Sequence, residues 1–425
     1  MKLKTLFCLF AALPLAVLSG CGGSSDDGPG QVRLINATTE YASLDFYASD
    51  TRVAAAVLQD SVSDYATLGA GTTTFKLKRA DSNTTTLSTD RTVSDGVYNT
   101  LVAYTTAGTL RTAYMTDSED APTSGTAKLR VFNTSSEAGS VDVYITSVGG
   151  SLTDASAVAS SLLSERTSGY SEIGSGSYRL VVTGAGDKTD LRLDIPSLTL
   201  VDQQVATLIL TNTQGGVLVH GLLLNQRGTA GAQKNTSARI RLVAGTTANA
   251  TVAASINGST LSTGLNSPTV GGYTLVPAGS LSTDIQVNGV AVATSGLTAA
   301  AGADISLMVL GPQGAPQVVL LSDDNRPPTT TSNVKLRLVH GLNNLNGSIT
   351  LSADYSAVAT DLAFGAASAT TSVPASTTYR LEATSPVATT PLYLATDVTL
   401  QATHIYTVFM LGDAAAPAGV LRRDR

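Results

Sequence analysis

The sequence predicts an all-β protein: four tandem immunoglobulin-like β-sandwich domains behind a lipoprotein signal peptide. Three observations lead to this prediction. Small and β-branched residues dominate, only 5% of residues are aromatic and Trp is absent, a composition that suits sheets and tight turns. A strand pattern centred on an arginine recurs four times. Between the recurrences lie short alternating stretches bounded by turn residues, about seven per ~90 residues, as in β-sandwiches.

The N-terminus predicts export and lipid anchoring. Lys2 and Lys4 precede an apolar stretch from Leu6 to Leu18, the pattern of a secretory signal peptide over residues 1–20. Leu18-Ser19-Gly20-Cys21 follows and resembles the lipobox of bacterial lipoproteins, in which the cysteine after the cleavage site is acylated. Cys21 is therefore the candidate lipidation site, and residues 21–30 form a flexible tether. An ordinary signal peptide or a short membrane helix is the alternative interpretation.

The four repeats open on similar strands. They are Val32-Arg33-Leu34, Leu129-Arg130-Val131, Ile240-Arg241-Leu242 and Leu336-Arg337-Leu338. Period-2 alternation places each arginine on the solvent face and its neighbours in the core. The arginines are 97, 111 and 96 residues apart. This spacing predicts sandwich domains over residues 31–117, 127–226, 238–324 and 334–425.

Further sequence motifs recur at similar positions after the arginine of each repeat. A second strand follows each arginine by about a dozen residues: Leu44-Asp45-Phe46-Tyr47, Val141-Asp142-Val143-Tyr144, Val252-Ala253-Ala254-Ser255 and Ile349-Thr350-Leu351-Ser352. Small-residue turns such as Gly69-Ala70-Gly71 precede a further alternating strand, and each repeat ends in an apolar hairpin. In the third repeat this hairpin turns at Gly311-Pro312-Gln313-Gly314.

The connections between repeats are polar. Linkers are expected over Asp117–Thr126, Gln226–Ser237 and Ser322–Asn333, which are rich in Pro, Gly, Ser or Thr. Polar linkers indicate small interfaces between domains, so each repeat is expected to fold alone. Asp154–Glu165, an Ala/Ser-rich insertion in the second repeat, is the main candidate for a short helix.

These motifs resemble a bacterial domain of unknown function, the DUF4397 family. The resemblance rests on Arg130-Val131-Phe132-Asn133, Val141-Asp142-Val143-Tyr144, Ser168-Gly169-Tyr170 and Gly176-Ser177-Tyr178, with Arg33-Leu34-Ile35-Asn36 and Leu44-Asp45-Phe46-Tyr47 in the first repeat. Repeats three and four depart from it, with Ala244 and His340 in place of Asn. The resemblance implies tandem domains of a lipoprotein or surface protein and supplies no catalytic residue.

No residue pattern predicts catalysis, a cofactor or a metal. Both cysteines, Cys8 and Cys21, lie in the first 21 residues, so the mature body offers no thiol. His220, His340 and His404 fall in different repeats, whereas a metal or a catalytic relay needs converging side chains. Structural roles are expected for all three. No nucleophile elbow, zinc motif or phosphate-binding loop occurs.

Two alternatives involve binding. Acidic clusters lie at two domain junctions, where oxygen ligands could hold Ca²⁺. The alternative is that these acidic residues are ordinary solvated turn residues. The clusters are Asp117, Glu119 and Asp120, and Asp323 and Asp324. With no Trp present, glycan-binding platforms would have to use the 14 tyrosines.

The preferred function is a non-catalytic cell-envelope lipoprotein, most compatible with the outer membrane, whose repeats serve as spacer, adhesive or interaction modules. Removing residues 1–20 leaves 24 basic and 32 acidic side chains, a net charge of −8, which argues against a nucleic-acid partner. Membrane lipid held through Cys21 is the expected partner. A module that binds polysaccharide or an envelope protein is the first alternative. An envelope hydrolase is the second, and two carboxylates facing each other across a cleft would indicate it.

Overall fold

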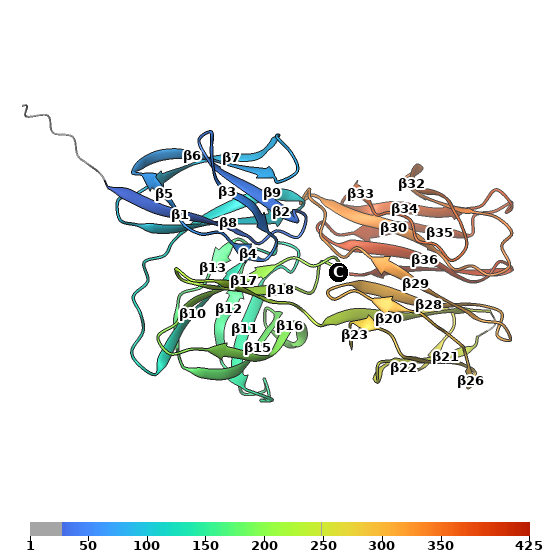
Figure 1. The fold of residues 1–425 in the computed structure, drawn as a ribbon. Helices are drawn as coiled ribbons and strands as arrows, with labels where there is room; N and C mark the ends of the chain where they lie inside the picture. The colour runs from blue at the N-terminus through green and yellow to red at the C-terminus, as the bar shows by residue number, and fades with distance from the viewer. Residues whose placement is uncertain (1–27, 248) are drawn as a thin grey trace, which may run out of the picture.

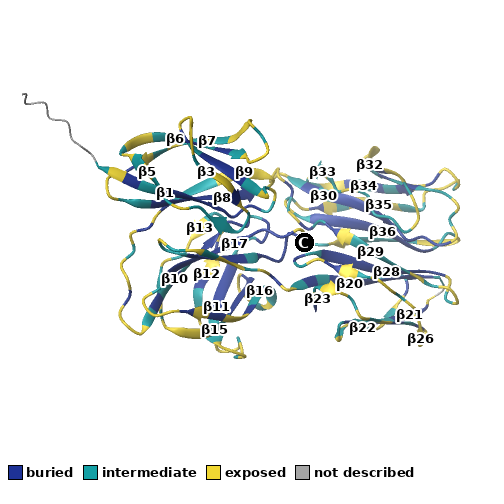
Figure 2. Ribbon diagram, in the orientation of Figure 1, coloured by how far each residue is buried: buried dark blue, intermediate teal, exposed yellow. Residues whose placement is uncertain are grey.

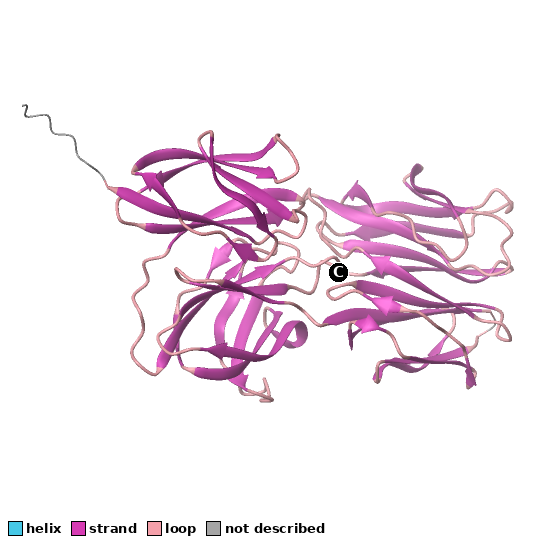
Figure 3. Ribbon diagram, viewed as in Figure 1, coloured by secondary structure: helices cyan, strands magenta, loops and turns pink. Residues whose placement is uncertain are grey.

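A computed structural model describes residues 28–247 and 249–425. Cys21, the predicted signal peptide and most of the predicted tether lie outside the described residues. The described chain folds into four β-sandwiches in sequence order and contains no helix (Figure 3). No helix that could span a membrane is therefore found among these residues. The prediction of an all-β tandem architecture is confirmed.

Each repeat has two main sheets. The sheet that holds the first strand of the repeat is called here the pairing sheet, and the other is the outer sheet. In repeat one the pairing sheet contains β1 (Pro29–Asn36), β4 (Ser61–Val62), β5 (Ala66–Gly69), β8 (Tyr98–Thr106) and β9 (Thr109–Thr116). Its outer sheet contains β2 (Ser43–Ala48), β3 (Thr51–Leu58), β6 (Gly71–Arg79) and β7 (Thr85–Val93).

Repeat two has the same plan with one added edge strand. The pairing sheet contains β10 (Thr126–Asn133), β13 (Arg166–Thr167), β14 (Ser171–Gly174), β17 (Val205–Thr211), β18 (His220–Asn225) and β19 (Ala230–Gln233). The outer sheet contains β11 (Val141–Ser147), β12 (Ala157–Leu162), β15 (Gly176–Gly184) and β16 (Asp187–Leu200).

Repeats three and four complete the chain. The pairing sheet of repeat three contains β20 (Ser237–Thr246), β23 (Thr269–Pro277), β28 (Asp304–Gly311) and β29 (Gln317–Asp323). The pairing sheet of repeat four contains β30 (Asn333–His340), β33 (Thr371–Pro374), β36 (Ile405–Asp413) and β37 (Ala416–Arg423). The outer sheet of repeat three contains β21 (Thr251–Ile256), β22 (Ser259–Asn266), β25 (Thr283–Val287) and β26 (Val290–Ala291). The outer sheet of repeat four contains β31 (Ile349–Ala353), β32 (Ser356–Leu362), β34 (Ser376–Thr384) and β35 (Tyr393–Leu400). A small ribbon joins β24 (Gly279–Ser280) to β27 (Thr298–Ala299).

Two local predictions were wrong. The Asp154–Glu165 insertion forms strand β12, which pairs with β11 at the sheet edge, because this pairing buries Ala159 and Leu162 in the core of the repeat. The expected linker Gln226–Ser237 contains β19, which pairs with β18. By contrast, the predicted hairpin of repeat three is confirmed, with Leu310 opposite Gln317 across the turn.

The sandwiches associate in two pairs through their pairing sheets (Figure 1). Between repeats one and two lies a buried apolar cluster from both: Ile35, Ala37, Val102, Tyr104, Met115, Phe132, Ile209, Leu222 and Leu224. A corresponding cluster joins repeats three and four: Val243, Val270, Met308, Leu310, Val339, Phe409 and Leu411. Each central pairing-sheet strand is therefore buried on both faces, as the continuous buried runs of β17 and β28 show (Figure 2). The expectation of small polar interfaces between all neighbouring repeats was wrong for these pairs.

Candidate functional site

The recurring arginines are buried between paired repeats. Arg33, Arg241 and Arg337 are 2%, 1% and 3% exposed, and only Arg130 is half-buried. The predicted solvent-facing position was wrong, because alternation identifies a second face without showing what covers it. In each repeat the first strand runs parallel to a central strand, which sets the arginine beside a hydroxyl. These pairs are Arg33 with Thr100, Arg130 with Thr207, Arg241 with Ser306 and Arg337 with Thr407.

In repeats three and four, an arginine of each repeat forms an ion pair with an aspartate of the other across their interface. Arg337 of repeat four pairs with Asp323 of repeat three, and Arg241 of repeat three pairs with Asp424 of repeat four as well as with Asp323. Asp323 also accepts hydrogen bonds from the Tyr273 hydroxyl at 2.5 Å and from Ser306 at 2.7 Å. Each carboxylate is thus fully used by protein donors.

The charge on Asp323 is stabilised by this arrangement. Burial alone would raise the pKa of the Asp323 carboxyl, but Arg241 and Arg337, together with the hydroxyl of Tyr273, outweigh burial and lower that pKa below its ordinary value. The cluster is therefore a set of ionised groups that joins two repeats.

Repeats one and two are joined by a similar but less complete set of arginine contacts. Arg33 lies 3.8 Å from Asp117 and donates to the backbone oxygens of Asn225 and Gly228 in repeat two. Thr100, Ser306 and Thr407 each donate to an aspartate 17 residues later in the chain. Counting 17 residues from Thr207 reaches Leu224, so repeat two has no such carboxylate.

The other motif residues also have structural roles. Asn36 donates to the backbone oxygens of Tyr41 and Val57, and Asn133 makes the equivalent bonds to Gly139 and Leu162. These bonds hold the loop after the first strand against the outer sheet. In repeat four His340 stands in this position; its Nδ1 accepts from the Leu342 amide and its Nε2 lies 3.4 Å from the Gly347 oxygen.

The aspartate of the second strand fixes an irregular edge strand. Asp45 accepts from the Ala56 amide at 2.7 Å, and Asp142 accepts from the Ser161 amide at 2.7 Å. Ala56 and Ser161 have φ angles of 47°, a left-handed conformation that non-glycine residues seldom adopt without compensation. Burial raises the pKa of Asp142, but the backbone N–H donors Ser161 and Gly186 lower it overall.

The remaining sequence candidates do not converge. His220 accepts from the Asn235 amide, and His404 contacts the Ala402 oxygen. Glu119 pairs with Lys128, and Asp324 pairs with Arg326 and Lys335. Within residues 28–247 and 249–425, no three His, Cys, Asp or Glu side chains are grouped as a metal site would require.

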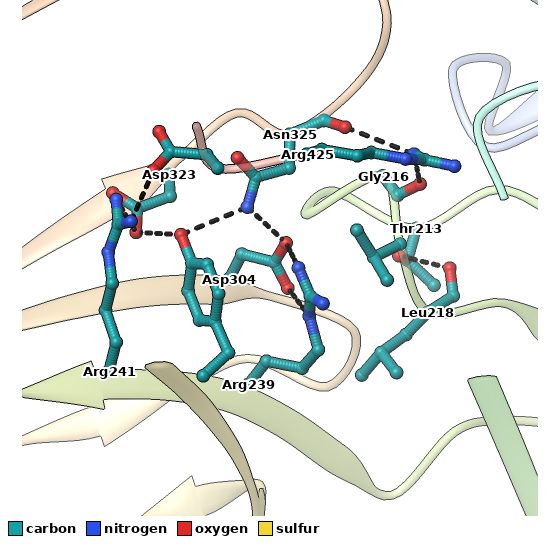
Figure 4. A network of polar contacts seen from close by, with 12 residues as sticks. Thr213, Gly216, Leu218, Arg239, Arg241, Asp304, Asp323, Asn325 and Arg425 are labelled. Carbon is teal, nitrogen blue, oxygen red and sulfur yellow. Dashed lines mark hydrogen bonds and ion pairs between the residues drawn. The ribbon is translucent and has the colours of Figure 1, made fainter. Parts of the chain in front are cut away.

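The two pairs meet at a polar junction (Figure 4). Arg239 contacts Asp304 through two hydrogen bonds, of 2.8 and 2.5 Å, and Asn325 links Asp304 to the Tyr273 hydroxyl. The Arg425 side chain donates to the backbone oxygens of Gly216 and Asn325. The β17–β18 loop of repeat two is thus tied to repeats three and four.

Beside this loop lies a cleft of about 410 Å³, here called the junction cleft. Its walls come from repeats one, two and three and from the linker before repeat four: Thr39, Glu40, Gln59, Glu137, Asn212, Thr213, Gln214, His220, Ala300, Ala301 and Arg326. This cleft was not predicted from the sequence. One signal was available: Glu40 and Glu137 each lie four residues after the motif asparagine.

A family comparison identifies the repeats. The model of the family described as "Domain of unknown function (DUF4397)" matches residues 30–144, 238–346 and 334–425. The chain belongs to the DUF4397 family. The matches leave most of repeat two outside, although its arginine, asparagine and aspartate fall within the first match. In this DUF4397 protein those residues pair sheets and fix loops, as shown above.

Three solved structures match parts of the chain at 10–11% identity. "Alpha-glucan binding by a streptococcal virulence factor" covers 42% of this chain and 93% of its own, with a TM-score of 0.16. "The Bacillus anthracis TIE protein" covers 91% and 69%, with a TM-score of 0.14. "Product complex of a multi-modular glycogen-degrading pneumococcal virulence factor SpuA" covers 88% and 38%, with a TM-score of 0.17. Scores this low support no functional inference. Among curated proteins, none matches the sequence significantly.

Proposed function

We propose that this DUF4397 protein is a non-catalytic lipoprotein of the bacterial outer membrane whose four sandwiches form a rigid spacer and interaction module. The observation that carries the proposal is the use of the recurring motif residues. Arginine and aspartate join the repeats, and asparagine and aspartate fix loops, so the repeated signature builds a scaffold.

The proposed anchor is an acylated Cys21. The lipobox supports it, and the acidic balance of the mature chain offers no electrostatic attachment to anionic lipid. Stable attachment through lipid needs at least two acyl chains, each buried CH₂ contributing about 0.8 kcal/mol. Gly22, rather than Asp, after the cysteine resembles the pattern of lipoproteins passed to the outer membrane.

The anchor predicts a specific labelling pattern. Cells fed a clickable fatty acid should yield labelled wild-type protein in the outer-membrane fraction, and Cys21→Ala should give no label. Cys8→Ala is the matched control, because Cys8 falls within the predicted signal peptide, and it should label normally. Unlabelled wild-type protein free in the periplasm would overturn the proposal.

Hydrolysis is a second candidate because Glu40 and Glu137 line one cleft. We favour binding: Glu40 Oε2 accepts hydrogen bonds from Thr105 and the Thr39 amide, which is a structural use of this side chain. We expect the pure protein to turn over no glycan, ester or peptide. Reproducible turnover that disappears in Glu137→Gln or Glu40→Gln would establish the hydrolase instead.

A further inference from the structure

Two residues that line the junction cleft, Glu137 and Asn212, each carry a buried acceptor atom that no described protein group satisfies. Glu137 and Asn212 are 5% and 4% exposed, yet Glu137 Oε2 and Asn212 Oδ1 have no hydrogen-bond partner in the described part of the chain. Leaving a buried polar atom unpaired is costly, and more so for a charged group. Both atoms are acceptors, so a complementary ligand must supply donors.

The two glutamates come from equivalent turns of repeats one and two. Glu40 follows β1 and Glu137 follows β10, and both line the cleft. In repeat one the Thr105 hydroxyl donates to the Glu40 carboxylate. The corresponding residue in repeat two is Asn212, whose side-chain N–H donates to the backbone oxygen of Thr105 instead. Glu137 therefore lacks the donor that its counterpart has.

The charges around the cleft leave an excess of carboxylate. Arg326 makes two hydrogen bonds to Asp324, at 2.7 and 3.2 Å, and Lys335 contacts the same carboxylate at 3.0 Å. Lys234 pairs with Asp60. These cations near the cleft thus already have anionic partners, whereas within residues 28–247 and 249–425 no cation lies within ion-pair distance of Glu137.

The nearby histidine adds no positive charge. Burial and the neighbouring Lys234 lower the pKa of His220 to about 4, so the ring is neutral at physiological pH. Its Nδ1 accepts from the Asn235 amide, which leaves the hydrogen on Nε2.

We propose that the junction cleft binds a small molecule bearing a primary ammonium group. An ammonium has three donors, no acceptor and a positive charge, which matches the unpaired oxygens of Glu137 and Asn212. Among the described residues, no Phe, Tyr or Trp lines the cleft, so they offer no stacking surface of the kind that sugar rings favour. The cleft volume lies in the usual range for small-ligand sites. This inference goes beyond the scaffold function and does not depend on the lipid anchor.

Binding should depend on pH through Glu137. Burial, the largest cause, and the charges of Glu40 and Asp324 raise its pKa, Arg326 and Lys335 oppose them, and the result is about 7. An alkyl ammonium stays charged well above this pH. Affinity should therefore rise roughly thirty-fold between pH 5.5 and 8 as Glu137 ionises.

The test uses isothermal titration of the soluble chain from residue 28 onward with 1,5-diaminopentane, and with 1,5-pentanediol as the neutral analogue. We expect saturable one-site binding of the diamine only. Glu137→Gln should weaken it at least tenfold and remove its pH dependence. The control Asp397→Asn, which deletes an exposed charge in repeat four, should bind like wild type.

Several results would overturn the proposal. They are no diamine binding at pH 8, equal binding of the diol, or an affinity unchanged in Glu137→Gln. The wild-type pH series requires no variant, so a flat series from pH 5.5 to 8 contradicts the proposal even if Glu137→Gln misfolds. Thermal melts of each variant at both pH values identify misfolding.

Discussion

Asp323 is the residue on which the second pair depends most. It is 3% exposed and contacts two arginines, a tyrosine and a serine from both repeats. Replacing a buried ion pair by apolar groups can be neutral, but removing one partner leaves an uncompensated buried charge. The network therefore contributes to which sheets pair as well as to stability.

Asp323→Asn should lower the free energy of unfolding of the second pair by about 3–5 kcal/mol, since Arg241 and Arg337 lose their shared carboxylate. The measurement is urea unfolding at pH 7, with Asp397→Asn as the matched control. The pKa of Asp323 is lowered in the folded state. Its stabilisation is thus present above the ordinary aspartate pKa of about 4 and is lost as pH falls through the folded value. The difference between variant and wild type should shrink accordingly in acid; an Asp323→Asn variant as stable as the control at pH 7 would refute the assignment.

Strands and turns were largely predictable at the level of single elements. Val141–Tyr144 and Ile305–Val309 alternate or run apolar between clear turn residues, and both form strands, β11 and β28. The arginine face was misassigned because period 2 defines two faces, and only tertiary packing decides what covers the second. A signal existed in the central strands: Leu307-Met308-Val309-Leu310 is apolar without a break, as expected of a strand buried on both faces.

The pairing faces change the expectation for a single repeat. Residues 126–236 alone would expose Phe132, Ile209, Leu222 and Leu224, which are buried against repeat one. Contiguous exposed apolar patches favour association. We therefore expect this fragment to aggregate or dimerise, whereas residues 28–236 should be a soluble monomer.

Light scattering after size exclusion tests this expectation. Ile209→Lys with Leu222→Glu in the single repeat should restore a monomer if the exposed sheet face is the cause. A monomeric, cooperatively melting wild-type fragment would instead support independent repeats, as the polar linkers alone suggested.

At the scale of the whole molecule, the junction cleft could not be predicted from sequence. Aligning the repeats shows Glu40 and Glu137 at equivalent positions, but nothing local indicates that their turns meet beside the β17–β18 loop. That placement requires repeat one to pair with repeat two and the second pair to dock on the loop, through contacts such as that of Arg425 with Gly216. The cleft is a property of the assembled chain.

Small-angle X-ray scattering of residues 28–425 tests most directly whether the four repeats form one compact body of two face-to-face pairs. We expect a radius of gyration only slightly above the roughly 21 Å of a compact chain of this length. We also expect a scattering profile that fits the assembled structure without flexible linkers. A radius well above that of a compact chain, with the scattering of separately moving domains, would contradict the pairing of the repeats.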